Sequence, residues 1–163
     1  MLGNPFDALR RPAFIIEPLE QEDTREAARI HAARFAQPWP RDDIQGLLSQ
    51  PTVFGFVARR EGRRKEGAGG FVLARLAADE AEILTIAVDA AFQRQGIGHQ
   101  LMDAVLRHLH GARAQALFLE VDEGNIAAIG LYQGLGFITV GKRPDYYSSG
   151  NSRSTALTMR RDF

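Results

Sequence analysis

Hydrophobic residues recur along this chain with two different periods, and the change of period marks the expected elements. Alternating or short apolar runs predict strands over residues 13–18, 53–59, 70–76, 82–88, 115–121, 137–140 and 155–160. Apolar residues three or four apart predict helices over residues 24–35, 41–48, 96–110 and 125–134. The resulting order, βααβββαβαββ, predicts an α/β domain with three layers around one sheet.

Two helical stripes carry most of this prediction. The first helix is expected to begin at Thr24, to end before Pro38-Trp39-Pro40, and to bury one face made of Ala27, Ile30, Ala33 and Phe35. The third helix should pack on the sheet through one stripe made of Ile97, Leu101, Val105 and Leu109.

The length of 163 residues suits one domain with one core. Residues 1–12, with two prolines and a pair of arginines, are expected to form a leader, and residues 13–163 the domain. The chain has 45% hydrophobic and 25% charged residues, which is typical of a globular protein. It has no cysteine and no apolar run long enough to span a bilayer, so we expect a cytoplasmic protein without a membrane role.

Charge gives no sign of a nucleic-acid partner. Twenty basic residues balance twenty acidic ones, so no overall field attracts a polyanion. A local basic run spans residues 59–65, but Glu61 interrupts it, Glu66 follows it, and no aromatic residue lies between the cations. We therefore expect a solvated hairpin tip there and no direct contact with nucleic acid.

A glycine-rich turn between an apolar strand and a helix offers the first candidate chemistry. Residues 93–98 read Gln-Arg-Gln-Gly-Ile-Gly. Unpaired N–H groups at a helix start, with small residues around them, can hold a phosphate or pyrophosphate. A dinucleotide fingerprint is disfavoured, because seven residues separate Gly96 from the strand and Leu101 replaces the third glycine. The chain also has no Gly-Lys-Ser/Thr triplet of a nucleotide-triphosphate loop. The remaining pattern, Gln/Arg-x-x-Gly-x-Gly, resembles the acyl-CoA pyrophosphate loop of the GNAT acetyltransferases.

A carboxylate lies in the strand after this helix. Alternation places Leu117, Leu119 and Val121 on one face and Phe118 with Glu120 on the other. Partial burial beside an aromatic ring favours the neutral form of a carboxyl group and suits a general base, although an arginine-paired structural glutamate fits the strand about equally well. Asn125 and Tyr132 are two helical turns apart and can address one ligand together, or can be a helix cap and a core aromatic.

The segments 119–121, 125–132 and 135–137 strongly resemble the second half of the RimI family, the ribosomal-protein-alanine N-acetyltransferases. The resemblance extends to residues 86–88, Pro38-Trp39, Arg143 and Tyr146-Tyr147, and so covers most of the chain from about residue 14. It implies a single-domain GNAT fold: a mixed, largely antiparallel sheet with splayed middle strands and helices on both faces.

The same resemblance implies a site for acetyl-CoA and for a protein N-terminus, possibly that of a ribosomal protein. Glu120 would be the general base and Tyr132 the general acid. The donor would bind Ile86, Ala87, Val88, Arg94, Gln95, Gly96, Ile97, Gly98, His99 and Asn125. The acceptor would lie near Trp39, Arg143, Tyr146 and Tyr147.

Direct transfer needs no nucleophilic side chain, which suits a chain without cysteine. The four histidines lack metal-ligand spacing, so no metal is expected. An acetyltransferase of the same fold acting on a small amine or a lysine side chain is the nearest alternative. A non-catalytic acyl-CoA sensor is a second alternative, but it would need neither Glu120 nor Tyr132.

Overall fold

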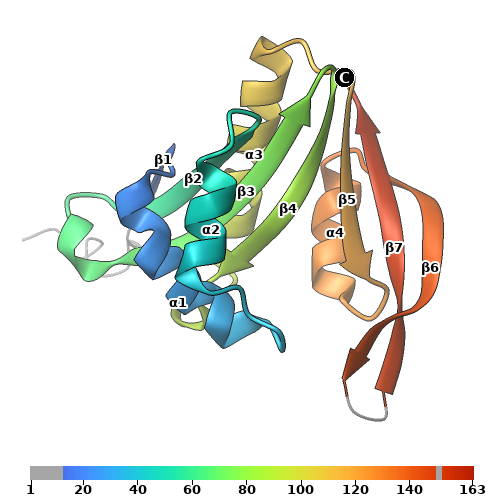
Figure 1. The fold of residues 1–163 in the computed structure, drawn as a ribbon, viewed down its shortest axis with the longest axis horizontal. Helices are drawn as coiled ribbons and strands as arrows, with labels where there is room; N and C mark the ends of the chain where they lie inside the picture. Colours follow the sequence, from blue (N-terminus) through green and yellow to red (C-terminus); the bar gives the residue numbers. More distant parts are fainter. Residues whose placement is uncertain (1–12, 150–151) are drawn as a thin grey trace, which may run out of the picture.

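One seven-stranded sheet organises the protein (Figure 1). The computed structural model describes the backbone of residues 13–149 and 152–163, and the side chains within these ranges except those of Arg64, residues 145–149 and residues 152–153. The strands lie in the order β1-β2-β3-β4-β5-β7-β6, and every neighbouring pair is antiparallel except β4 with β5. The expected leader, residues 1–12, lies outside the described residues.

The observed elements follow the expected order. The strands are β1 (Phe14–Pro18), β2 (Val53–Arg60), β3 (Ala68–Ala77), β4 (Glu80–Val88), β5 (Ala116–Asp122), β6 (Ile138–Ser149) and β7 (Ser152–Asp162). The α-helices are α1 (Thr24–Arg34), α2 (Arg41–Leu48), α3 (Ile97–Gly111) and α4 (Ile126–Gly134). Short 3-10 turns are η2 (Gln21–Asp23), η3 (Arg64–Glu66) and η4 (Ala90–Phe92).

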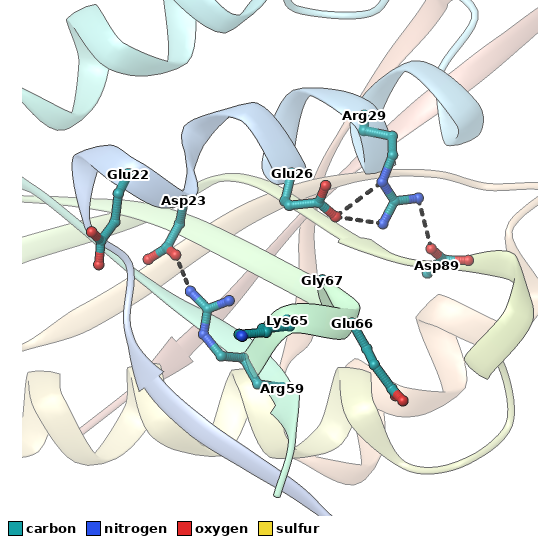
Figure 2. Close-up of a pocket in the computed structure, with 9 residues that line it drawn as sticks. All are labelled: Glu22, Asp23, Glu26, Arg29, Arg59, Lys65, Glu66, Gly67 and Asp89. Atoms are coloured by element: carbon teal, nitrogen blue, oxygen red, sulfur yellow. Dashed lines mark hydrogen bonds and ion pairs between the residues drawn. The ribbon is translucent and has the colours of Figure 1, made fainter. Parts of the chain in front are cut away.

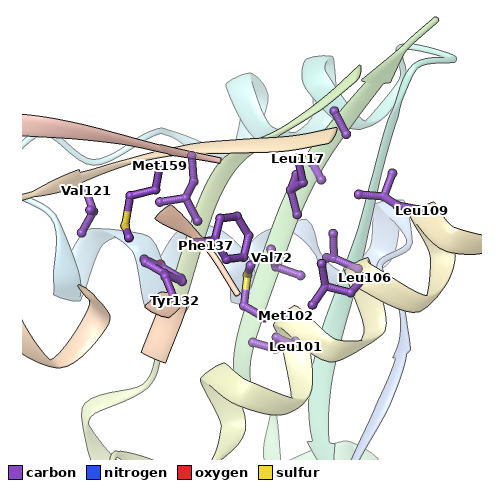
Figure 3. Packing of buried hydrophobic residues seen from close by; sticks show 14 of the residues in the cluster. Val72, Leu101, Met102, Leu106, Leu109, Leu117, Val121, Tyr132, Phe137 and Met159 are labelled. Carbon is purple, nitrogen blue, oxygen red and sulfur yellow. The ribbon is translucent and has the colours of Figure 1, made fainter. Parts of the chain in front are cut away.

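Helices cover both faces of the sheet, and each face has its own core. On one face α1 and α2 bury Ala27, Ile30 and Ile44 against β2 and β3. On the other, α3 and α4 pack against β3, β5 and β7, with Leu101 and Leu117 fully buried (Figure 3). The expected GNAT fold class, with a mixed and mostly antiparallel sheet between helices, is confirmed.

The predicted stripe of α3 is confirmed, since all four of its residues are at most 1% exposed. The stripe of α1 was predicted wrongly at its end. The helix stops at Arg34, Ala33 and Phe35 are exposed, and His31 is buried one turn after Ala27. The aromatic ring of Phe35 stacks on His31 instead of entering the core.

The last hairpin is much longer than the two short strands that the sequence predicts. Strand β6 continues to Ser149 although Pro144 lacks an N–H group. It can do so because β6 is the outermost strand of the sheet, where one row of backbone groups needs no partner strand. Interruptions of the register lie between Thr139 and Gly141 and between Arg143 and Tyr147.

Candidate functional site

The two middle strands separate along their length. Parallel pairing joins β4 to β5 only from Glu80 with Ala116 to Glu82 with Phe118, whereas β4 continues to Val88 (Figure 1). Residues 86–88 pair with β3 on one side only. The β4 backbone groups that point toward β5 therefore remain available to a ligand with amide groups. The predicted splay is confirmed.

The glycine-rich turn, residues 93–98, follows β4 by way of the short turn η4. Asp89 starts η4, Arg94 has a positive φ of 60°, and Gly96 precedes α3 with φ 80° and ψ 12°. This left-handed conformation favours glycine, and no side chain caps the helix at this position. The N–H groups of the first turn of α3 therefore face the space before the helix, as an anion requires.

Gly98 lies where the turn meets the splay. A Cβ atom built on it would be 3.4 Å from Leu131 Cδ2 in α4 and 4.0 Å from Val88 Cγ2 in β4. The missing side chain thus keeps the space between the end of β4 and α4 open. In the same turn the side-chain oxygen Oε1 of Gln95 is buried and has no hydrogen-bond partner among the described atoms. Both features fit a bound donor with a pyrophosphate and amide groups.

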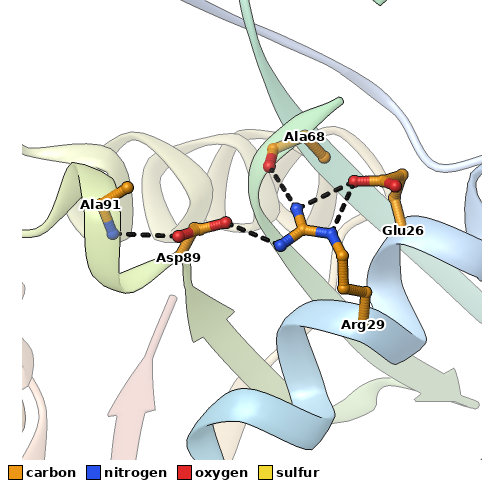
Figure 4. Close-up of polar contacts among 5 residues, drawn as sticks. All are labelled: Glu26, Arg29, Ala68, Asp89 and Ala91. Atoms are coloured by element: carbon orange, nitrogen blue, oxygen red, sulfur yellow. Dashed lines mark hydrogen bonds and ion pairs between the residues drawn. The ribbon is translucent and has the colours of Figure 1, made fainter. Parts of the chain in front are cut away.

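A charged network holds the turn against α1 (Figure 4). Asp89 Oδ1 accepts the N–H of Ala91 at 2.9 Å, and Oδ2 accepts from Arg29 Nη1 at 2.9 Å. Arg29 also donates to Glu26 Oε2 and, at 3.4 Å, to the carbonyl of Ala68. The Ala91 N–H and the Arg29 guanidinium lower the pKa of Asp89. Hydrogen bonds from Arg29 to Glu26 and Asp89 raise the pKa of Arg29.

Sequence reasoning missed Arg29 and Asp89. The available signal was a carboxylate directly after a buried strand, but its arginine partner comes from a helix 60 residues earlier. A second contact joins the same two parts: the amide oxygen of Gln93, in the orientation that satisfies its hydrogen bonds, accepts from Arg34 Nη2 at 2.6 Å. The predicted phosphate turn is therefore braced by α1.

Glu120 lies on β5 just beyond the last residue paired with β4. The alternation of β5 is as predicted, with Leu119 and Val121 buried and Glu120 on the other face. Its carboxylate is 32% exposed and pairs with Arg143 Nη2 of β6 at 2.9 Å. The Arg160 guanidinium also covers the ring of Phe118 at 5.1 Å. The expected apolar surroundings are thus wrong, and the arginine-paired alternative describes the observed state.

Asn125 and Tyr132 lie in different surroundings. Asn125 is exposed and caps α4, where its Oδ1 accepts the N–H of Ala128 at 3.2 Å. Tyr132 is only 6% exposed and belongs to the core on the α3 side (Figure 3). Its ring meets that of Phe137 edge to face at 5.8 Å. Each side chain therefore has a structural role, and their roles toward a ligand stay predictions.

Comparison with known proteins identifies the chain. The sequence pattern of the Acetyltransferase (GNAT) family matches residues 16–137. The protein belongs to the GNAT acetyltransferase family. The splayed strands and the glycine-rich turn of this GNAT domain agree with that assignment, and the chain is an acetyl-CoA-dependent N-acetyltransferase.

Its relatives in the GNAT family include RimI-type enzymes. The chain is 37% identical over 149 residues to the N-alpha-acetyltransferase RimI of Mycobacterium tuberculosis, covering 90% of this chain and 91% of that protein. It is 31% identical over 144 residues to the ribosomal protein bS18-alanine N-acetyltransferase of Escherichia coli, covering 88% and 94%. The crystal structure of the corresponding Escherichia coli enzyme superposes with a TM-score of 0.84 at 30% identity over 92% and 94% of the two chains.

The expected acceptor residues of the GNAT domain come from two distant segments. Trp39 is half-buried, its backbone N–H donates to His31 Nδ1 at 3.0 Å, and its ring stacks on that of His31 with the ring centres 5.0 Å apart. Burial lowers the pKa of His31, which keeps the ring neutral and its Nδ1 able to accept. No pattern in the sequence indicates this role for His31. Tyr146 and Tyr147 belong to β6, but their side chains lie outside the described part of the protein.

A surface pocket of about 640 Å³ lies next to the Arg29–Asp89 pair that braces the glycine-rich turn (Figure 2). It is formed by η2, the first turns of α1, the β2–β3 hairpin and Asp89, and none of the predicted site residues lines it. Arg59, in its wall, is only 12% exposed and forms ion pairs with Glu17 and Asp23. The prediction of a solvated tip is therefore wrong for Arg59, because Glu17 of β1 and Asp23 of η2 pack their carboxylates against it.

Two further observations concern only residues 13–149 and 152–163. No helix within these ranges is long and apolar enough to cross a membrane. Histidine, aspartate and glutamate side chains in the same ranges form no group of three that could hold a metal ion.

Proposed function

We propose that this GNAT enzyme acetylates the N-terminal α-amine of a protein, with a ribosomal protein as the first candidate. The observation that carries this proposal is the position of Glu120. It is the first carboxylate on β5 beyond the point where the two middle strands part, on the strand opposite the open edge of residues 86–88. The RimI-type relatives, which match most of this chain, support an α-amine as acceptor.

The donor is held from both ends of the splay. The N–H groups of Ile97, Gly98 and His99 bind its pyrophosphate, with Arg94, Gln95 and Gly96 shaping the turn. The backbone of Ile86, Ala87 and Val88 pairs with its amide groups, and Asn125 contacts it at the start of α4. These contacts place the thioester beside Glu120.

The transfer then needs three proton movements. An α-ammonium group, with a pKa of about 8, gives a proton to Glu120 through a water molecule. The neutral nitrogen attacks the thioester carbonyl carbon, so that an N–C bond forms and the C–S bond breaks. Tyr132 gives its proton to the departing sulfur, while the attacking nitrogen loses its second proton to solvent. Most of the rate gain comes from holding the amine and thioester together.

The test combines a peptide panel with a matched pair of variants. The enzyme is incubated with acetyl-CoA and peptides that carry either a free N-terminal alanine or a blocked N-terminus and a lysine, and the products are read by intact mass. Glu120→Gln should lower kcat/KM by about 100- to 10,000-fold, because only the basic oxygen is lost. Glu82→Gln is the control, since Glu82 is also a strand glutamate and pairs with Arg75 at 3.0 Å.

Two results would contradict the proposal. Acetylation of the lysine peptides alone would favour the lysine or small-amine alternative. Binding of acetyl-CoA without acetylation of any peptide or small amine would favour the sensor. Full activity of Glu120→Gln would remove Glu120 from the mechanism while leaving the choice of acceptor intact.

A further inference from the structure

The ion pair between Glu120 and Arg143 spans three strands. Strand β7 lies between β5 and β6, so the Arg143 side chain crosses a distance of two strand spacings, about 10 Å. The register places Ala156 of β7 opposite Arg143. This small residue leaves space over β7 for a long side chain, and the guanidinium reaches Glu120 Oε1 at 2.9 Å.

Arg143 has a carboxylate nearer in register, yet it pairs with Glu120. Asp122 of β5 is opposite Ala156 and so lies in the same cross-strand row as Arg143. The two oxygens of Asp122 accept from the Gly124 N–H at 2.8 Å and from the Ser154 hydroxyl at 2.7 Å. A cationic group is therefore held at the proposed base, where the ammonium of an acceptor has to arrive.

We propose that Arg143 is a specificity-determining residue that favours acceptors with a carboxylate side chain close to the α-amine. This inference rests on the proposed function. The incoming ammonium, with the water molecule that links it to Glu120, replaces the guanidinium there, and the released guanidinium pairs with an acidic side chain at the second or third residue of the acceptor. An N-terminus that carries a positive α-ammonium group and a negative side chain can therefore pair with both Glu120 and Arg143.

The surroundings permit this exchange. The side chains of Arg143 and Glu120 are 57% and 32% exposed, so the guanidinium can turn away from Glu120 without any rearrangement of the core. Arg160 lies over Phe118 on the same face, but its guanidinium pairs with Asp162 at 2.7 Å, so Arg143 is the cation that the exchange releases. Once an ammonium occupies Glu120, the released Arg143 guanidinium attracts an acidic side chain of the acceptor and repels a basic one.

The experiment measures kcat/KM for peptides that start with alanine and carry glutamate, glutamine or lysine at residue two or three. For the wild-type enzyme we expect glutamate to exceed glutamine by about two- to fivefold, with lysine lowest, because an exposed charge pair contributes this much. The difference should appear in KM with kcat unchanged. Arg143→Gln should abolish the difference, and Arg143→Lys should retain its order.

Arg75→Gln is the matched control, because Arg75 also pairs with a strand glutamate at 3.0 Å but on the closed part of the sheet. It should keep the wild-type preference. Equal kcat/KM for the glutamate and glutamine peptides, or an undiminished preference in Arg143→Gln, would overturn the inference and leave N-terminal acetylation intact. No acetylation of any free N-terminus would instead overturn the proposed function, and with it this inference.

Discussion

Replacing Gly98 by valine tests the donor site most directly. The first added carbon would already be in van der Waals contact with Leu131 Cδ2 at 3.4 Å. The two further methyl groups of valine must then press on Leu131 and Val88 or turn toward the N–H groups that are proposed to bind pyrophosphate. Either choice narrows the space between the end of β4 and α4.

The expected size of the effect follows from this geometry. Loss of one hydrogen bond to a charged phosphate costs about 1.5–3 kcal/mol, so affinity for coenzyme A should fall about 10- to 150-fold. Overpacking against Leu131 should lower the stability by about 1–3 kcal/mol and Tm by about 2–12 °C. Gly98→Ala adds only the carbon that fits, so its affinity should stay within about threefold of the wild type.

Calorimetry with coenzyme A gives the dissociation constant, and a thermal melt shows whether each variant is folded. Gly130→Val is the control, because Gly130 is in α4 and exposed, and a Cβ atom there meets no described atom within 4 Å. Gly130→Val should leave the dissociation constant for coenzyme A and the Tm near those of the wild type. A folded Gly98→Val protein with unchanged affinity for coenzyme A would refute the placement of the donor at this turn.

Two other predictions concern Tyr132 and His31. Tyr132→Phe keeps the ring that packs on Phe137 and removes the proposed acid, so kcat should fall about 100-fold or more with Tm nearly unchanged; full turnover would exclude the role. Burial lowers the pKa of His31 below 6.5, so below that pH the unfolded chain binds a proton that the folded protein does not, and stability falls as the pH drops. The free energy of unfolding, measured by urea titration at about pH 7.5 and about pH 5.5, should fall more for the wild type than for His31→Gln. The extra loss should be up to about 1.4 kcal/mol per pH unit. His110→Gln, at an exposed position of α3, should retain the wild-type difference, and an equal loss in all three proteins would contradict this reasoning.

The sequence predicts those features of the fold that depend on local periodicity. The stripe of α3 and the alternation of β5 follow directly from the burial of one face. The end of α1 does not, because Phe35 looks like a core residue but lies just beyond the helix and stacks on His31. The length of β6 could not be predicted either, because an outermost strand that contains Pro144 lacks the alternating pattern of a half-buried strand.

In the candidate site too, the sequence predicts the local features and misses the contacts between distant segments. The turn at residues 93–98 and the strand of Glu120 could be placed from the sequence, because glycine and alternation are local signals. The partner of Glu120 could not, since Arg143 reaches it across an intervening strand whose position depends on the whole topology. The Arg29–Asp89 brace was missed for the same reason.

The short pairing between β4 and β5 divides the sheet into two parts. One part holds β1 to β4 and the other holds β5 to β7, and the β4–β5 ladder between them has only three residue pairs. A donor bound along the open edge would add hydrogen bonds across this seam and join the two parts. Because a ligand that binds only the folded protein stabilises it, the lifetime of this enzyme in the cell would rise with the supply of acetyl-CoA.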